Sequence, residues 1–276
     1  MNIAQALSAA AALGVARLDA QLLLLHVLGR ESSDRAWLLA HDADVVDQEK
    51  GDAYLALARR RAGGEPLAYL VGEKEFFGLP LKVDARVLVP RPETETLVEW
   101  ALEVIAGIQS PRVIDLGTGS GAIALAIKKA RPDAVVEAVD QSPGALEVAA
   151  ANAKALSLEV AFRQSSWLAG TTEREYHLIV SNPPYVRDAD PHLQALTHEP
   201  LSALAAGEDG LADLRTIVAQ APHHLRPGGW LLLEHGYDQA GEVRALLAAA
   251  GLTEPQSRND LAGIARCSGA KMPALG

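Results

Sequence analysis

The sequence predicts an α/β protein in which a small helical domain precedes a parallel sheet covered by helices. Leucine and alanine recur at helical spacing up to about residue 72, whereas the residues from Gly72 to Pro90 alternate as in a β-hairpin. After Pro92, strand-like and helix-like segments alternate along the chain. Because helix-length connections between parallel strands cross over in the right-handed sense, the leading architecture is a Rossmann-like, doubly wound sheet.

Length and composition limit the classes of protein to which the chain could belong. The chain has 276 residues, of which 49% are hydrophobic and 22% charged, enough for one large core or a core with a small satellite domain. Its formal net charge of −10 argues against tight non-specific binding to nucleic acid. The single cysteine, Cys267, excludes an internal disulfide framework, the N-terminus lacks the basic start of a signal peptide, and the apolar runs are far shorter than the roughly 18 residues of a membrane span. We therefore expect a soluble cytoplasmic protein.

The first part of the chain is expected to be a helical domain over residues 1–72. Its helices are marked by the spacing of Leu18, Leu22 and Leu25, and glycines at 29 and 63–64 are expected to end two of them. A β-hairpin linker over 73–90 and an α/β domain over 91–276 follow. The basic run at 59–61 is best interpreted as a solvated helix face.

The α/β domain is expected to open with a helix and then to alternate strands with helices. The expected helices cover residues 97–108, 122–130, 145–156 and 211–225, and the expected strands cover 112–116 and 135–140, regions near Val160 and Tyr176, and 230–234.

A glycine-rich turn follows the first of these strands. It consists of Gly117, Thr118, Gly119, Ser120 and Gly121 and leads directly into a helix. Residues without a Cβ tolerate positive φ and let the backbone approach a ligand at a helix N-terminus. The same turn also satisfies a relaxed dinucleotide fingerprint, or could be a tight connection without a ligand.

Asp140 ends the next expected strand, where a carboxylate can accept hydrogen bonds from both hydroxyls of an adenosine ribose. NAD and S-adenosylmethionine both contain this ribose, so Asp140 alone does not separate them. A helix cap formed with Ser142 and Pro143 is the competing structural interpretation.

The segment Asn182-Pro183-Pro184-Tyr185 ends another expected strand, where two prolines stop the backbone pairing. In an open α/β sheet, ligands bind beyond such strand ends. Asn182 offers a side-chain carbonyl, Pro183 a backbone carbonyl on a rigid unit, and Tyr185 an aromatic face. Two acceptors can hold both hydrogens of a planar NH2 group.

An amide or exocyclic amine is a poor nucleophile, so holding it in line with an electrophilic methyl group is the type of catalysis that this segment favours. Hydride transfer has no evident use for the acceptor pair, which favours S-adenosylmethionine over NAD. A glutamine amide and an adenine base both fit, and no metal ligand set is expected.

The sequence resembles the HemK-type protein glutamine methyltransferases that modify peptide chain release factors. The match extends over nearly the whole chain. It is carried by Leu-Asp-Ala at 18–20, Glu-Pro-Leu-Ala-Tyr at 65–69, Pro-Arg-Pro-Glu-Thr-Glu at 90–95, the glycine loop, Asn-Pro-Pro-Tyr at 182–185, Glu199-Pro200, Asp-Gly-Leu at 209–211 and Pro-Gly-Gly at 227–229.

The resemblance implies methyl transfer to the side-chain nitrogen of the glutamine in the Gly-Gly-Gln motif of class 1 release factors, with no direct nucleic acid binding. It implies that the N-terminal domain recognises the substrate protein. On this model, residues 117–121 surround the methionine part of the cofactor, Asp140 holds the ribose, and Trp167 lies against adenine. Asn182, Pro183, Pro184 and Tyr185 receive the glutamine, and Asn182 also faces the cofactor. Ser166 stands where the family commonly has an acidic residue, and a core role for Trp167 stays open.

Three alternatives stay open at this point: modification of a glutamine in a large-subunit ribosomal protein, methylation of adenine N6 in flipped-out DNA or RNA, and a non-catalytic cofactor-binding module. The charged residues Arg91, Glu93 and Glu95 are expected to form a network at a helix start. Glu199, Pro200, Glu234 and His235 are expected to line or support the site, with His235 structural rather than a base.

Overall fold

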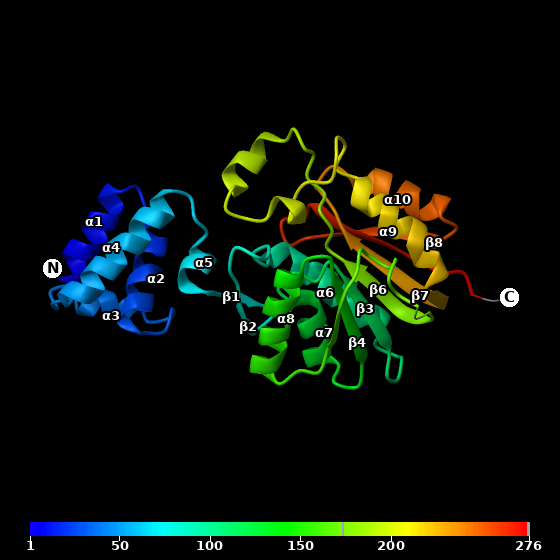
Figure 1. Ribbon diagram of the computed structural model, residues 1–276, viewed down its shortest axis with the longest axis horizontal. Coiled ribbons are helices and arrows are strands. Elements are labelled where there is room, and N and C mark those ends of the chain that lie inside the picture. The colour runs from blue at the N-terminus through cyan, green and yellow to red at the C-terminus, as the bar shows by residue number, and fades with distance from the viewer. Residues whose placement is uncertain (173, 275–276) are drawn as a thin grey trace. The chain divides into compact units, whose positions relative to one another are not determined.

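The computed structural model describes residues 1–172 and 174–274. The chain forms two compact units, Met1–Glu73 and Lys74–Gly276 (Figure 1). The division therefore falls inside the first strand of the hairpin, and most of the hairpin belongs with the second unit.

The first unit is a helical domain. Its core contains the buried side chains of Leu23, Leu24, Leu25, Leu38 and Tyr54. Its helices are α1 (Ile3–Ala12), α2 (Arg17–Leu28), α3 (Arg35–Ala40), α4 (Gln48–Ala62) and α5 (Leu67–Val71).

Local sequence accounts for several ends of these helices. Asn2 and Gln5 form a reciprocal capping box before α1, and Gly29 ends α2 in the left-handed conformation. The basic run on α4 is more than a solvated face, because Arg61 Nε donates to Asp19 of α2 at 2.7 Å and Arg60 pairs with Glu65. The charges at 60 and 61 thus join parts of the helical unit.

The second unit begins with the hairpin β1 (Glu73–Phe76) and β2 (Leu79–Lys82). Phe77 and Gly78, the two residues between the strands, both have positive φ, as expected in a two-residue hairpin turn. The expectation of β-structure up to Pro90 is wrong for residues 83–90, which form no strand. The alternation there has another cause, since Val83, Val87 and Val89 are buried from an irregular segment.

The main sheet has seven strands in the order β5-β4-β3-β6-β7-β9-β8. Five strands run parallel, which confirms the doubly wound architecture, but β9 is antiparallel to both β7 and β8. The sheet is therefore mixed rather than wholly parallel. The strands are β3 (Arg112–Leu116), β4 (Val135–Asp140), β5 (Ala161–Gln164), β6 (Tyr176–Ser181), β7 (Leu225–Glu234), β8 (Thr253–Asn259) and β9 (Ala265–Lys271).

Helices cover both faces of the sheet (Figure 1). Strand residues alternate between two cores: Val113 packs with the first helices and Ile114 with the later ones. The first group is α6 (Glu95–Val104), α7 (Ala122–Ala130) and α8 (Pro143–Leu156), and the second is α9 (Ala212–Gln220) and α10 (Ala240–Ala249).

Short 3-10 helices are η1 (Pro92–Thr94), η2 (Pro191–Leu196), η3 (Leu201–Ala203) and η4 (Ala221–His223). They account for two shifted boundaries. The helix expected over 97–108 begins earlier, after η1, and ends at Val104. The helix expected over 211–225 ends at Gln220, because η4 contains Pro222 and leads into β7. None of the helices in the described part of the chain is long and apolar enough to cross a membrane.

Candidate active site

A cavity lies within the second unit, at the carboxyl ends of β3, β4 and β6. It is lined by five parts of the chain: the hairpin with the irregular segment after it, the glycine loop with the start of α7, the residues after β4, the residues after β5, and the residues between β6 and β7. Its lining includes Arg86, Arg91, Thr94, Gly117, Thr118, Gly119, Ser120, Asp140, Trp167, Asn182, Pro184, Pro200 and Asp213.

Most of the residues expected from the sequence meet at this cavity, but three do not line it. Gly121 lies behind the loop at the start of α7, and Pro183 is buried. Tyr185 is half-buried and turns its hydroxyl toward Glu234. The cavity wall is therefore made by eight of the expected residues: Gly117, Thr118, Gly119, Ser120, Asp140, Trp167, Asn182 and Pro184.

Backbone contacts hold the glycine loop in place. The N–H groups of Gly117 and Thr118 both donate to the carbonyl of Val139 at the end of β4, at 2.8 and 3.0 Å. The N–H of Gly119 donates to Asp140 Oδ2 at 2.9 Å, and the second oxygen of Asp140 accepts from Ser142 N–H at 2.9 Å. Asp140 thus fixes the loop through Gly119, contacts Ser142 at the start of α8 and also lines the cavity. A structural role and a ligand-binding role are therefore compatible.

A buried carboxylate supports the same loop from below. Asp115 accepts a hydrogen bond from the Thr118 hydroxyl at 2.6 Å and one from the N–H of Ala124 at 3.3 Å. Burial raises the pKa of Asp115 to about 7, and these two hydrogen bonds oppose the shift. Asp115 Oδ1 has no hydrogen-bond partner among the described residues.

Two glycines in the loop are required for different reasons. A Cβ at Gly117, which has φ +69°, would lie 3.1 Å from the ring of Trp167. A Cβ at Gly119, which has φ +55°, would meet nothing within 4 Å, although Gly119 lines the cavity. The middle of the loop therefore presents bare backbone to open space, which fits a ligand held close to main-chain atoms.

Trp167 adopts an unusual backbone conformation at the cavity wall. Its φ of +52° is rare for a bulky residue without strain. Its half-buried ring faces Gly117 and packs at the edge of the second core. Trp167 also donates a hydrogen bond to Asp213, but burial has the larger effect on that carboxyl and raises its pKa. The ring therefore belongs to both the cavity and the core.

The residues after β6 are fixed by side-chain contacts. Asn182 Nδ2 donates to Thr94 Oγ1 at 3.2 Å, and the Tyr185 hydroxyl donates to Glu234 Oε1 at 3.2 Å. Burial raises the pKa of Tyr185 strongly, and the Glu234 charge adds to this shift, so the phenol stays protonated.

The expectation that Arg91, Glu93 and Glu95 form a network at a helix start is not borne out, because Arg91 and Glu95 contact distant segments instead. Glu199 is buried and accepts from the guanidinium of Arg91 and from the N–H of Val89 at 3.0 Å. Glu95 instead accepts from the N–H of Phe77 in the hairpin turn at 2.9 Å. Arg91 therefore both lines the cavity and holds the segment that contains Glu199.

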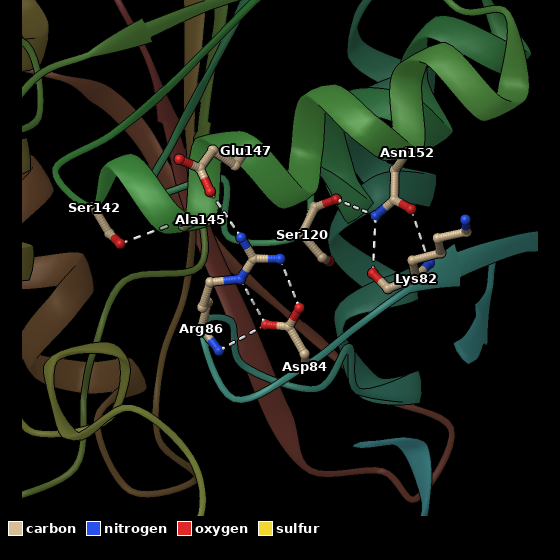
Figure 2. A network of polar contacts seen from close by, with 8 residues as sticks. All are labelled: Lys82, Asp84, Arg86, Ser120, Ser142, Ala145, Glu147 and Asn152. Atoms are coloured by element: carbon tan, nitrogen blue, oxygen red, sulfur yellow. Dashed lines mark hydrogen bonds and ion pairs between the residues drawn. The ribbon is translucent and has the colours of Figure 1, made fainter. Parts of the chain in front are cut away.

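A second network joins the hairpin to the glycine loop and to α8 (Figure 2). Buried Asn152 accepts from Lys82 N–H at 2.8 Å and donates to the carbonyls of Lys82 and Ser120 at 3.0 and 2.9 Å. Arg86 bridges Asp84 and Glu147 (Figure 2). Sequence reasoning missed Asn152, Arg86 and Asp213, because none of them lies in a motif with a recognisable spacing.

Two other residues take structural positions. The ring of His235 is fully buried, with Nδ1 2.8 Å from the carbonyl of Gly236 and Nε2 2.7 Å from Ser268 Oγ. Burial lowers the pKa of His235 and raises that of the buried thiol of Cys267. Across residues 1–172 and 174–274, no three acidic, histidine or cysteine side chains are grouped as metal ligands would be.

Comparison with known proteins places both units in described families. Residues 2–72 match the PrmC N-terminal domain model, and residues 94–210 match the methyltransferase small domain model. The chain also shares its fold with solved structures: a methyltransferase from Pyrococcus furiosus has a TM-score of 0.54 and 18% identity, covering 72% of this chain and 91% of that one. The 16S rRNA N2 methyltransferase of Thermus thermophilus, solved with AdoMet and guanosine, has a TM-score of 0.54 and 22% identity over 72% and 49% of the chains.

Curated relatives match over almost their full length. The release factor glutamine methyltransferase of Burkholderia pseudomallei is 50% identical, with 93% of this chain and 92% of the relative covered. The proteins of that name from Coxiella burnetii and Escherichia coli are 47% and 43% identical, covering 91% and 88% of this chain and 90% and 88% of the relatives. With both units matched and this level of identity, the chain belongs to the release factor glutamine methyltransferase family.

Proposed function

We propose that this protein transfers the methyl group of S-adenosyl-L-methionine to N5 of the glutamine in the Gly-Gly-Gln motif of class 1 peptide chain release factors. The observation that carries the proposal is near-full-length identity of about half to relatives of that name, together with a cavity that joins the glycine loop to the Asn182 segment. The products are S-adenosyl-L-homocysteine and N5-methylglutamine, and one proton leaves the amide nitrogen.

The glycine loop and its neighbours are the proposed cofactor site. When bound, the cofactor supplies an electrophilic methyl group on a positively charged sulfur. Gly117, Thr118, Gly119 and Ser120 would contact its methionine part through the backbone, with Gly121 supporting the turn from the start of α7. The cavity lining includes the carboxyls of Asp140 and Asp213 and the guanidinium groups of Arg86 and Arg91, so side chains of both signs are available to the charged groups of the cofactor.

Asp140 and Trp167 are the proposed contacts to the adenosine part. Each Asp140 oxygen already accepts one backbone N–H and retains a lone pair for a ribose hydroxyl. The left-handed conformation of Trp167 supports a ligand role for its ring, because strained residues concentrate at functional sites.

Asn182, Pro183, Pro184 and Tyr185 form the proposed glutamine site. The carbonyl oxygens of Asn182 and Pro183 would accept the two N–H bonds of the substrate amide and aim its lone pair at the methyl group, with Asn182 also bordering the cofactor site. Tyr185 would supply a flat apolar surface from its half-buried ring. Holding a weak nucleophile in line is the catalytic contribution of this segment.

The test is transfer of labelled methyl from S-adenosylmethionine to three separate acceptors: purified release factor, ribosomal large subunits and unmethylated DNA. We expect label in the release factor, and none in a release factor whose motif glutamine is replaced by alanine. Label confined to ribosomal protein or to DNA would reject the proposed substrate. We place this activity in the cytoplasm, where release factors act on ribosomes, and the buried, unpaired Cys267 is compatible with a reducing compartment.

A further inference from the structure

A hollow in the first unit lies between α2 and α3. Each helix contributes the arginine at its first position and the residues one and four positions later. The lining includes Arg17, Leu18 and Gln21 of α2 and Arg35, Ala36 and Leu39 of α3. We call this surface the basic hollow. It shares no residue with the cavity of the candidate active site.

The two arginines of the basic hollow are exposed, and neither is paired with an acidic side chain in the part of the chain that the structure describes. The carboxylates closest to them in sequence pair with other arginines. Asp19 accepts from Arg61 Nε at 2.7 Å, and Asp34 lies 3.2 Å from Arg30. The basic hollow therefore presents two uncompensated positive charges, on a chain whose formal net charge is −10.

A nearly buried amide lies between these charges. Gln21 is only 7% exposed, yet its side chain makes no hydrogen bond with residues 1–172 or 174–274. Its amide atoms are not enclosed in the core either, so the small exposed part of the residue includes the amide that reaches the hollow. Buried polar groups are normally paired. An amide has donors and an acceptor, so the group that best satisfies it is another amide, such as a peptide group.

The start of α2 and two leucines complete the surface. Ala16, at the N-cap of this 12-residue helix, makes no side-chain hydrogen bond, so the first N–H groups of the helix lack a capping partner. The partial positive charge at a helix start favours an anion. Leu18 and Leu39 are 48% and 60% exposed and add apolar surface beside the charges. The matching ligand is a peptide segment in which a carboxylate lies next to an apolar side chain.

We propose that the basic hollow binds an acidic segment of the protein that this enzyme methylates. Arg17 and Arg35 would hold a carboxylate, and Gln21 would hold a peptide group beside it. A nucleic acid backbone would satisfy the arginines, but it offers no peptide group to Gln21 and no apolar side chain to Leu18 and Leu39. The inference rests on the proposed function, because it takes the methyl acceptor to be a protein.

Binding at this surface should affect substrate affinity rather than the rate of methyl transfer. The basic hollow contributes no residue to the cavity, so its contacts are the same before and during the reaction. Interactions of equal strength in the ground state and the transition state lower KM and leave kcat unchanged. This separates the basic hollow from Asn182, whose loss should lower kcat.

The experiment measures kcat, the KM for the acceptor protein and cofactor affinity in the full-length chain. We expect Arg17→Glu with Arg35→Glu to raise this KM by about tenfold or more, because like charges then meet across the contact. Gln21→Leu, which keeps the volume but removes the amide, should raise it by about threefold or more. In all of these variants, kcat and cofactor affinity should stay within about twofold of wild type.

Two further measurements identify the charge as the cause. Arg17→Lys with Arg35→Lys retains both charges and should keep the KM within about threefold of wild type. The wild-type KM should rise with sodium chloride concentration, and the double glutamate variant should lose this dependence. The matched control is Arg59→Glu, which reverses an exposed, unpaired arginine of the same unit outside the hollow and should leave the KM unchanged.

Several results would overturn the inference: an unchanged KM in the double glutamate variant, an equal rise in Arg59→Glu, or a loss of kcat in place of the change in KM. Binding of an RNA oligonucleotide that requires both arginines, with an unchanged KM for the acceptor protein, would assign the hollow to nucleic acid instead. Each KM is measured on the protein that wild type methylates. Failure to label the release factor therefore rejects the proposed function, whereas a KM that ignores the hollow rejects only this inference.

Discussion

Two neighbouring strand ends form this cavity by opposite means. After β3 the chain continues through glycines with positive φ, and the wall is backbone held by backbone contacts to Val139 and Asp140. After β6 it continues through two prolines, and the wall is made by side chains held by Thr94 and Glu234. The two ends are adjacent, since Leu116 pairs with Ser181 and the Ser181 hydroxyl donates to the Leu116 carbonyl at 2.7 Å.

A wall of backbone and a wall of side chains suit different tasks: binding a large ligand and orienting a single reacting group. A backbone wall changes little with most substitutions and suits a large ligand that touches many main-chain atoms. A side-chain wall on a φ-locked segment fixes a few atoms within a narrow range of positions. We therefore expect substitutions at the glycine loop and its supports to affect cofactor affinity or stability, and substitutions after β6 to affect the rate.

The largest effect is expected for Asn182→Ala. Removal of one of the two acceptors for the substrate amide should lower kcat by about 100-fold, comparable to the loss of one preorganised hydrogen-bonding group elsewhere. Cofactor affinity measured by calorimetry should change by less than about threefold, because the glycine loop is intact. A normal rate would remove Asn182 from the acceptor role and end the contrast between the two strand ends.

Asn152→Ala tests the support of the glycine loop. The substitution removes three hydrogen bonds from a buried site and leaves the Lys82 and Ser120 groups unpaired, which should cost about 2–3 kcal/mol of unfolding free energy. Chemical denaturation measures this cost, with the exposed Asn259→Ala as control. Cofactor affinity should fall with it, while kcat at saturating cofactor stays near wild type; a selective loss of kcat would contradict the separation of roles.

Asp140→Ala tests the carboxylate that serves both loop and cavity. We expect cofactor affinity to fall by about tenfold, since a charge-assisted hydrogen bond contributes about 1.5–3 kcal/mol and the loop contact to Gly119 is lost as well. Calorimetry with Asp52→Ala, an exposed position in the helical unit, as control decides the result. Unchanged affinity would count against the ribose contact.

The smallest expected effect is a pH dependence of stability that comes from Glu234. Its pKa in the folded protein, about 7, lies above the ordinary value of 4.5, so the folded state binds the proton more tightly than the unfolded state. This contribution is fully present below pH 4.5 and is lost as the pH rises through 7. Glu234→Gln should therefore gain about 1–2 kcal/mol relative to wild type between pH 5 and pH 8, measured by urea unfolding. If the unfolding free energies of wild type and Glu234→Gln changed equally with pH, the pKa of Glu234 would not be raised by burial.

Sequence patterns predicted those parts of the fold that have strong local signals. Strands β3, β4 and β6 are short segments rich in Val, Ile and Leu, and the glycine loop after β3 and the prolines after β6 mark two of their ends. Strands β8 and β9 were missed because Thr-Glu-Pro-Gln-Ser-Arg-Asn and Ala-Arg-Cys-Ser-Gly-Ala-Lys contain few β-branched or large apolar residues. Their pairing depends on contacts with β7, which no local pattern records.

The candidate site shows the same division. Motif residues such as Gly119, Asp140 and Asn182 could be found from the sequence, because the chemistry of each is local to a strand end. The contacts of Asn152 with Lys82, of Thr94 with Asn182 and of Glu234 with Tyr185 could not be found, because the partners are 70, 88 and 49 positions apart along the chain. Residues that support a site through contacts distant in sequence can be identified only from the structure.

The place of the cavity in the chain has a consequence for how variants can be designed. Every cavity-lining residue, from Phe76 to Asp213, belongs to the second unit, whose first residue is Lys74. The lining can therefore be altered by substitutions within the second unit alone, with the sequence of the helical unit unchanged.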